Sequence, residues 1–345
     1  MSLEHPLKRP AVRRSQRGAA LLTAMVIVTL IATLAAGMVW QQWRAVQVEA
    51  AERARAQGQW VLAGAIDWAR LILREDAKAD QQKGGAATDN LGEPWAVPLA
   101  ESNLSTFLAA DKSDAEAAPD AFLSGSIVDA ASFYNLQNLM ISNASDPADR
   151  LKKEAEARNV LERIGRLAGT SPGSVDLIVN GMRQALAGEL GSGTTTPSDA
   201  PLTPSTLDEL AWFGVSKADI EKLRPYVTLA QGRPSFVNLN TASKEVISAV
   251  ANIDLATADR VVQLRTKQPF GSLGDASKQL GTTNTFSAAA FDVKTYYFFV
   301  RGRLRLEDRV VEEQALMHRV NTTVTVVSRQ RLNALDAASA TPSGG

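Results

Sequence analysis

The chain offers few side chains that could perform acid–base or nucleophilic chemistry. Its only histidines are His5 and His318, and it has no cysteine. This composition excludes a disulfide scaffold, thiolate metal sites, a cysteine nucleophile and a histidine-rich metal site. The sequence also lacks the phosphate-loop and His-Glu-x-x-His patterns, and its Gly-x-Ser-x-Gly match at residues 169–173 falls in a turn between two predicted helices, not after a strand. His318 lies in a strand-like apolar run, where we interpret it as structural. We therefore predict that the protein is not an enzyme.

Oxygen ligands for a hard cation are present but scattered. Asp129, Asn135, Asp275 and Asp292 fall near predicted loops, and carboxylate and amide oxygens are the ligands that calcium prefers. Their spacing does not match an EF-hand, so solvated loop residues are the default interpretation. The sequence predicts no certain cofactor and leaves calcium as a candidate without assigned ligands.

The most informative segment is the N-terminal stretch, whose charge pattern changes between Gly18 and Ala19. Residues 1–18 carry five basic side chains against one acidic side chain, whereas residues 19–43 carry no charge. About 20 apolar residues suffice for a helix to cross a bilayer. Trp40 and Trp43 stand at the far end of this run, where indole rings favour the membrane interface, and the basic residues precede it. The positive-inside rule predicts a single-pass protein with a cytoplasmic N-terminus and an exported body.

Three interpretations of this segment compete. A secretory signal peptide would be cleaved near Ala35-Ala36-Gly37, after a shorter apolar region. A plain anchor would stay uncleaved. The third interpretation is a leader that ends at Gly18, because the basic stretch stops directly against the apolar run; this resembles type IV prepilins and type II secretion pseudopilins, which prepilin peptidase cuts after the glycine.

The residues beyond the apolar run favour the third interpretation. Good helix formers dominate from Trp40 to about Ala77, and proline is absent there. One helix of about 55 residues is therefore expected from the membrane into the exported body. Trp60, Gly64, Trp68 and Ile72 recur every four residues, and we predict that this stripe packs the helix against the globular domain.

The remaining chain has the composition of a globular domain, with 45% hydrophobic and 21% charged residues. Loops with short strands are expected before residue 137, and helices over 149–190 and 207–229. A flexible linker or an exposed loop is expected over 191–206, and turn-separated runs predict an antiparallel meander near the C-terminus.

Residues 236–281 resemble a helix-hairpin-helix unit, a module found in many DNA-binding proteins. The segment Asn240-Thr-Ala-Ser243 is the predicted cap of its first helix, but the hairpin reads Asn252-Ile253-Asp254 where DNA-binding members have two glycines. The unit has five basic and four acidic residues, whereas phosphate binding needs a marked basic excess. We predict a structural or protein-contacting module. A membrane-anchored DNA-uptake protein is the alternative.

From end to end the chain resembles the K-type minor pseudopilins of the type II secretion system (GspK family). The most specific segments are Arg17–Leu22, Leu223–Val227 and Val237–Ala242. The resemblance implies an α+β pseudopilin fold with a long N-terminal transmembrane helix, an antiparallel sheet and a large inserted helical domain that contains the helix-hairpin-helix (SAM-like) unit. The implied parts are a leader (1–18), a membrane segment (19–43), the rest of the helix (44–77), a core (78–137 and 285–330), the insertion (138–284) and a tail (331–345).

The resemblance also implies a function and a set of partners. It predicts a non-enzymatic subunit at the tip of the pseudopilus, anchored in the inner membrane of a Gram-negative bacterium, with its bulk in the periplasm. Partners would be the I- and J-type minor pseudopilins, prepilin peptidase and the inner-membrane platform, with no nucleic acid. Ala19 would become the N-methylated first residue. The fifth mature residue is Thr23, where most pseudopilins carry glutamate and K-type proteins do not; this favours the uppermost position, because no subunit above needs a carboxylate partner.

Overall fold

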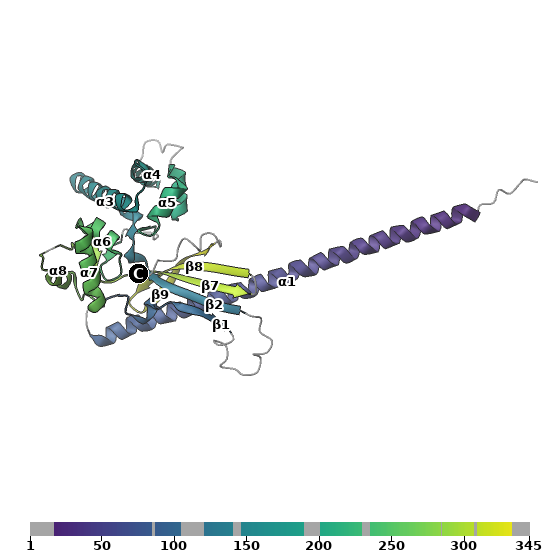
Figure 1. The fold of residues 1–345 in the computed structure, drawn as a ribbon, viewed down its shortest axis with the longest axis horizontal. Helices are drawn as coiled ribbons and strands as arrows, with labels where there is room; N and C mark the ends of the chain where they lie inside the picture. Colours follow the sequence, from purple (N-terminus) through teal and green to yellow (C-terminus); the bar gives the residue numbers. More distant parts are fainter. Residues whose placement is uncertain are drawn as a thin grey trace, which may run out of the picture. The chain divides into compact units, whose positions relative to one another are not determined.

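The computed structural model describes residues 17–84, 87–104, 121–140, 146–189, 201–229, 235–283, 285–306 and 309–332. Long helices and an antiparallel sheet make it an α+β protein, which confirms the predicted fold class (Figure 1). The chain divides into two compact units, residues 1–59 and 60–345. The predicted leader up to residue 16 and the tail from residue 333 lie outside the described residues.

Helix α1 (Arg17–Lys83) has 67 residues and is longer than predicted. Alanine, leucine and glutamine keep helix propensity high along it, and no proline interrupts it. In the first unit, every described side chain from residue 19 to residue 50 is exposed.

One five-stranded antiparallel sheet forms the core of the second unit, in the order β1-β2-β7-β8-β9 (Figure 1). Its strands are β1 (Leu99–Asn103), β2 (Ala121–Asp129), β7 (Tyr297–Leu306), β8 (Arg309–Val320) and β9 (Thr323–Leu332). The last three form the predicted meander. Strand β2 pairs directly with β7, from Ala121 opposite Leu306 to Asp129 opposite Phe298. Residues 130–296 therefore lie between two strands that are neighbours in the sheet.

The C-terminal part of α1 packs on one face of this sheet, but not through the predicted stripe. Leu62, Ile66 and Leu73 are fully buried, whereas Trp60 is 80% and Trp68 46% exposed. Spacings of three and four residues fit several faces of one helix. The face that packs against the sheet is the aliphatic one, with Leu62, Ile66 and Leu73. Gly302 of β7 permits the approach, since a Cβ there would lie 3.2 Å from Leu62 Cδ2.

The helical region between β2 and β7 has its own apolar core. It contains α3 (Pro147–Ala168), α4 (Ser174–Glu189), η4 (Leu207–Phe213), α5 (Lys217–Leu223), α6 (Lys244–Ala251), α7 (Leu255–Lys267) and α8 (Leu273–Leu280). We call this region the insertion. The prediction of helix throughout 207–229 was wrong at its end, where Val227–Thr228 form strand β4.

Two short parallel ladders flank the insertion. Strand β3 (Tyr134–Asn135) pairs with β4 (Val227–Thr228), and β5 (Val237–Asn238) pairs with β6 (Phe291–Asp292). The short helices η1 (Pro94–Ala96), η2 (Ala130–Ser132) and η3 (Leu136–Leu139) complete the connections. The chain therefore enters and leaves the insertion through paired backbone segments.

Helices α6 and α7 form the predicted helix-hairpin-helix unit. Asn252 adopts the left-handed conformation, with φ of 53°, that closes α6. The Asp254 carboxylate then accepts a hydrogen bond from the Thr257 backbone N–H at 2.9 Å and caps α7. A carboxylate thus stands at the start of α7, where a DNA-binding hairpin would offer its backbone N–H groups to phosphate.

Candidate functional site

The predicted processing residues lie at the start of α1. Gly18 and Ala19 belong to its first turn. The Thr23 hydroxyl lies 3.0 Å from the Ala20 carbonyl oxygen and 3.1 Å from the Ala19 carbonyl oxygen. Thr23 therefore donates its hydrogen bond within its own helix, whereas a glutamate there would need a partner from another chain to offset its burial in an apolar phase.

The N-terminal part of α1 is long and apolar enough to span a membrane, by length and composition. Its most apolar window has a mean hydropathy of 2.4 and no buried residue. Trp40 and Trp43 stack with their ring centroids 5.5 Å apart, at the end of the uncharged run of residues 19–43. Such a surface needs an apolar environment around its whole circumference.

The C-terminal part of α1 presents a second exposed apolar surface. Trp60, Gly64, Trp68 and Leu71 lie on the side away from the sheet, and all four are exposed. A Cβ on Gly64 would meet no heavy atom within 4 Å. We call these four residues the outer face of α1. Large apolar side chains around a glycine offer another helix a close contact.

Three carboxylates converge where α1 ends. Asp76, Asp89 and Glu93 place ligand oxygens within 4.8 Å of one another. Arg319 of β8 reaches this acid cluster: its Nη1 lies 2.9 Å from Asp76 Oδ2, and its Nη2 donates to Asp89 Oδ1. The guanidinium also lies over the Phe298 ring, 4.6 Å from the centroid. The cluster thus joins α1, the segment after it and the sheet.

The acid cluster retains a proton near neutral pH. Burial raises the pKa of Glu93 to about 8, with further contributions from the charges of Asp76 and Asp89. Glu93 accepts hydrogen bonds from Trp95 Nε1 at 2.5 Å and from Asn90 Nδ2 at 2.6 Å. Burial also raises the pKa of Asp76 to about 6, and Arg319 opposes the shift. One guanidinium faces three carboxylates that are buried or half-buried, so the cluster favours protonation of one of them.

The acid cluster does not fit a calcium ion, because Arg319 already bridges two of its three carboxylates. The four residues named from the sequence are not brought together as ligands either. Asp129 and Asn135 cap η2 and η3, the Asp292 side chain accepts from the Val293 N–H, and Asp275 lies in the first turn of α8. The described residues therefore assign no calcium site.

The segment Val237–Ala242 connects the insertion to the sheet and to the acid cluster. Asn238 Nδ2 donates to Asp129 Oδ2 at 2.8 Å and to the Asp89 carbonyl at 3.0 Å. Thr241 donates to the same Asp129 oxygen at 2.6 Å. Burial raises the pKa of Asp129 to about 6, and the hydrogen bond from Thr241 opposes the shift. We call Asp129, Asn238 and Thr241 the joint.

Asn240 extends the joint into the helix-hairpin-helix unit. Its side chain accepts from the Phe270 N–H at 2.9 Å and donates to the Phe270 carbonyl at 3.0 Å. Asn240 is 2% exposed and Asn238 fully buried. Buried amides with satisfied hydrogen bonds fix one arrangement of the elements they join. The two asparagines therefore explain why this segment is distinctive, a role that the sequence alone did not reveal.

Comparisons with known proteins agree with this architecture. The sequence profile of the family "Type II secretion system (T2SS), protein K" matches residues 237–294. The type II secretion system protein K of Pseudomonas aeruginosa is 27% identical over 86% of this chain and 87% of that protein. The protein of the same name from Pectobacterium carotovorum is 24% identical over 92% of this chain and 97% of its own length.

A solved structure shares the fold. One chain from the crystal structure titled as the GspK-GspI-GspJ complex of enterotoxigenic Escherichia coli superposes with a TM-score of 0.59. The match has 16% sequence identity and covers 82% of this chain and 99% of that chain. The profile, the relatives and the fold together confirm the resemblance to the K-type proteins.

Proposed function

Since the chain is similar to type II secretion system protein K over most of its length, we propose that it is a minor pseudopilin that caps the tip of the type II secretion pseudopilus. In that position it would assist assembly of the fibre and export of folded proteins across the outer membrane. The observation that carries the tip position is Thr23. Its hydroxyl is satisfied within α1, so this subunit has no carboxylate there to offer to a subunit above it.

Processing at Gly18 follows from this role. Prepilin peptidase would cleave between Gly18 and Ala19, and Ala19 would become the N-methylated first residue. The change from a basic leader to an uncharged apolar helix at this bond supports the proposal. The same charge asymmetry supports an inner-membrane anchor with a cytoplasmic N-terminus and a periplasmic body.

The outer face of α1 is the surface that we assign to the I- and J-type partners. Trp60, Trp68 and Leu71 are exposed on it, although soluble domains seldom leave such a row open to water. The similar solved chain comes from a complex titled with a GspI and a GspJ chain. The assignment agrees with a non-enzymatic assembly role.

The DNA-uptake alternative has less support. The hairpin between α6 and α7 is closed by Asn252 and capped by the Asp254 carboxylate. A negative charge at this helix start repels phosphate. We expect no binding to duplex DNA at 0.15 M salt, and a submicromolar affinity measured by fluorescence anisotropy would favour the alternative.

The tip proposal is tested by counting copies of the chain. Full-length protein assembled with the I- and J-type proteins should yield a complex with one copy of this chain, measured by native mass spectrometry. Thr23→Glu supplies the missing carboxylate, and we expect it to allow further copies in isolated fibres, whereas Thr23→Val should not. Wild-type chain found along the whole fibre, or no complex with either partner, would contradict the proposal.

Processing is tested separately. We expect Gly18→Leu to leave the leader attached, as measured by the N-terminal mass of the membrane-extracted protein. The control is Gly37→Leu, a change within the uncharged run. Normal maturation of Gly18→Leu would contradict the cleavage site.

A further inference from the structure

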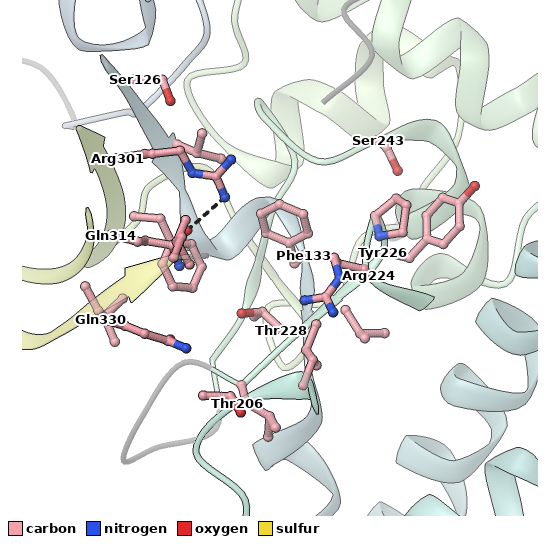
Figure 2. Close-up of a pocket in the computed structure, with 18 of the residues that line it drawn as sticks. Ser126, Phe133, Thr206, Arg224, Tyr226, Thr228, Ser243, Arg301, Gln314 and Gln330 are labelled. Atoms are coloured by element: carbon pink, nitrogen blue, oxygen red, sulfur yellow. Dashed lines mark hydrogen bonds between the residues drawn. The ribbon is translucent and has the colours of Figure 1, made fainter. Parts of the chain in front are cut away.

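A groove of about 890 Å³ lies between the insertion and the face of the sheet that points away from α1 (Figure 2). Its sheet wall carries Ser126, Arg301, Gln314 and Gln330. Thr206, Arg224, Thr228 and Ser243 belong to the opposite wall, and the Phe133 ring lies between the two groups in Figure 2. The groove has no part in membrane anchoring or in the outer face of α1.

The sheet wall is ordered in rows that cross the strands. Ser126, Arg301, Gln314 and Gln330 are direct register partners on β2, β7, β8 and β9. We call them the polar row. Neighbouring strands lie about 4.8 Å apart, so the row presents hydroxyl, guanidinium and amide groups at a regular interval. Arg301 Nη2 donates to Gln314 Oε1 at 3.2 Å, while Ser126 and Gln330 make no side-chain hydrogen bond within the described ranges of the chain.

Glu312 gives the groove an acceptor without a partner. It lies next to the polar row on β8, opposite Arg303, and its side chain is 6% exposed. Its Oε1 lies 3.3 Å from Arg303 Nε, but its Oε2 has no hydrogen-bond partner among the described residues. An unpaired buried carboxylate oxygen is unfavourable, so the site favours a ligand that donates a hydrogen bond.

The charges around the groove favour an uncharged donor. Five basic and four acidic residues line it, and Arg224 with Asp208, Lys244 with Asp259 and Arg303 with Glu312 form ion pairs among them. Phosphate or carboxylate ligands need an excess of unpaired cations. A cationic ligand would meet Arg301 and Arg303 beside Glu312. Hydroxyl groups, which both donate and accept, match this mixed lining.

A second row supplies an apolar floor. Val128, Phe299 and Leu316 are register partners directly beside the polar row. The Phe299 ring contacts Phe133 edge to face, with centroids 6.5 Å apart. Aromatic faces attract the positive edges of C–H groups, which sugar rings present above and below their hydroxyls. A peptide strand would need an open backbone edge, whereas this wall is a row of side chains on the face of a sheet.

We propose that this groove binds a short stretch of an uncharged glycan chain, which lies across the strands along the polar row and donates one hydroxyl hydrogen bond to the Glu312 carboxylate. The half-buried Val128 and Phe299 side chains of the apolar row contact the C–H faces of the sugar rings, above the buried Leu316. The polar row contacts their hydroxyls and acetamido groups. This site is independent of the tip role, so either proposal can fail alone.

The test uses full-length protein in detergent and four probes: tetra-N-acetylchitotetraose, cellotetraose, a heparin-derived tetrasaccharide and an uncharged hexapeptide. We expect the first two to bind in saturation-transfer NMR and calorimetry, and the anionic sugar and the peptide not to bind. Glu312→Gln replaces one acceptor with a donor and should weaken binding about tenfold. Gln330→Ala should weaken it by a smaller factor.

Matched controls lie one residue further along the same strands. Glu313→Gln and Arg331→Ala change residues that face away from the groove, and they should leave affinity unchanged. The proposal is overturned if neither neutral tetrasaccharide binds the folded wild type, or if the heparin fragment or the peptide binds more tightly. Equal loss of affinity in Glu312→Gln and Glu313→Gln would also overturn it.

Discussion

The two parts of α1 differ in what covers their apolar side chains. From residue 19 to residue 50 the helix exposes every described side chain and buries none, so a bilayer or another protein must cover its apolar surface. From residue 60 onward it buries one aliphatic face, including Leu62, Ile66 and Leu73, and ends at the acid cluster. The first part therefore depends on its surroundings, and the second on contacts made within the folded domain.

Arg319→Met should cause the largest loss of stability where the second part of α1 contacts the folded domain. It leaves Asp76 and Asp89 buried without their cation, which costs about 3–5 kcal/mol of unfolding free energy. Urea denaturation of the detergent-solubilised protein measures this loss. Arg329→Met is the control, because the side chain of Arg329 is 40% exposed and lies 3.9 Å from Glu313. A loss below 1 kcal/mol in Arg319→Met would show that the cluster does not hold α1 to the sheet.

Gly302→Val should have the next largest effect. The added atoms collide with Leu62, whose Cδ2 would lie 3.2 Å from the new Cβ. Overpacking of this kind costs about 1–3 kcal/mol. Gly64→Ala, on the outer face of α1, should instead stabilise the helix by up to about 1 kcal/mol. Both changes are read from the same denaturation curves, and effects of equal sign would contradict the assignment of the two faces.

The pH dependence should be smaller. The pKa of Glu93 is raised to about 8 in the folded protein, so its contribution to stability is full below its unfolded pKa, near 4.5, and is lost as the pH rises through 8. With solvent screening, we expect about 1–2 kcal/mol less stability at pH 9 than at pH 6. Thermal unfolding across this range measures it, and Glu93→Gln should flatten the upper part of the profile. If stability falls with pH as steeply in that variant as in the wild type, the pH dependence arises from groups other than Glu93.

Trp60→Ala should change stability least. Trp60 is 80% exposed, so we expect a difference within about 0.5 kcal/mol in unfolding free energy. The same variant should weaken the complex with the I- and J-type proteins, measured by calorimetry. Leu62 lies two residues further along α1 on its buried face. Leu62→Ala should therefore destabilise the fold by about 2–5 kcal/mol and leave partner binding by the folded protein unchanged. Unaltered partner binding in Trp60→Ala would remove the outer face as a docking surface.

The sequence predicted those features that depend on local patterns. The apolar run, the missing prolines and the charge step at Gly18 predicted α1, and the Ser243 cap and the apolar spacing predicted the helix-hairpin-helix unit. The C-terminal meander was predicted because turn residues separate runs in which apolar and polar side chains alternate. These features need only neighbours in sequence.

The acid cluster and the joint could not be predicted in this way. Asp76, Asp89 and Arg319 come from distant segments, and each resembles an ordinary surface charge in the sequence. Asn238 belongs to a recognised segment, but its partner Asp129 lies at the end of β2. The buried face of α1 was missed for a related reason: the tryptophans were the largest apolar residues, yet it is Leu62 that packs against the sheet, next to Gly302 of a distant strand.

The direct pairing of β2 with β7 has a consequence for biogenesis. The central ladder, with Asp129 opposite Phe298, cannot form until the entire insertion has emerged, whereas the insertion has an apolar core of its own and mostly local helical contacts. Slow closure of a distant strand pair after fast local folding is the expected order. Until β7 is available, β2 would therefore stay unpaired on one side, and this open strand edge would be most exposed to wrong pairing at that stage.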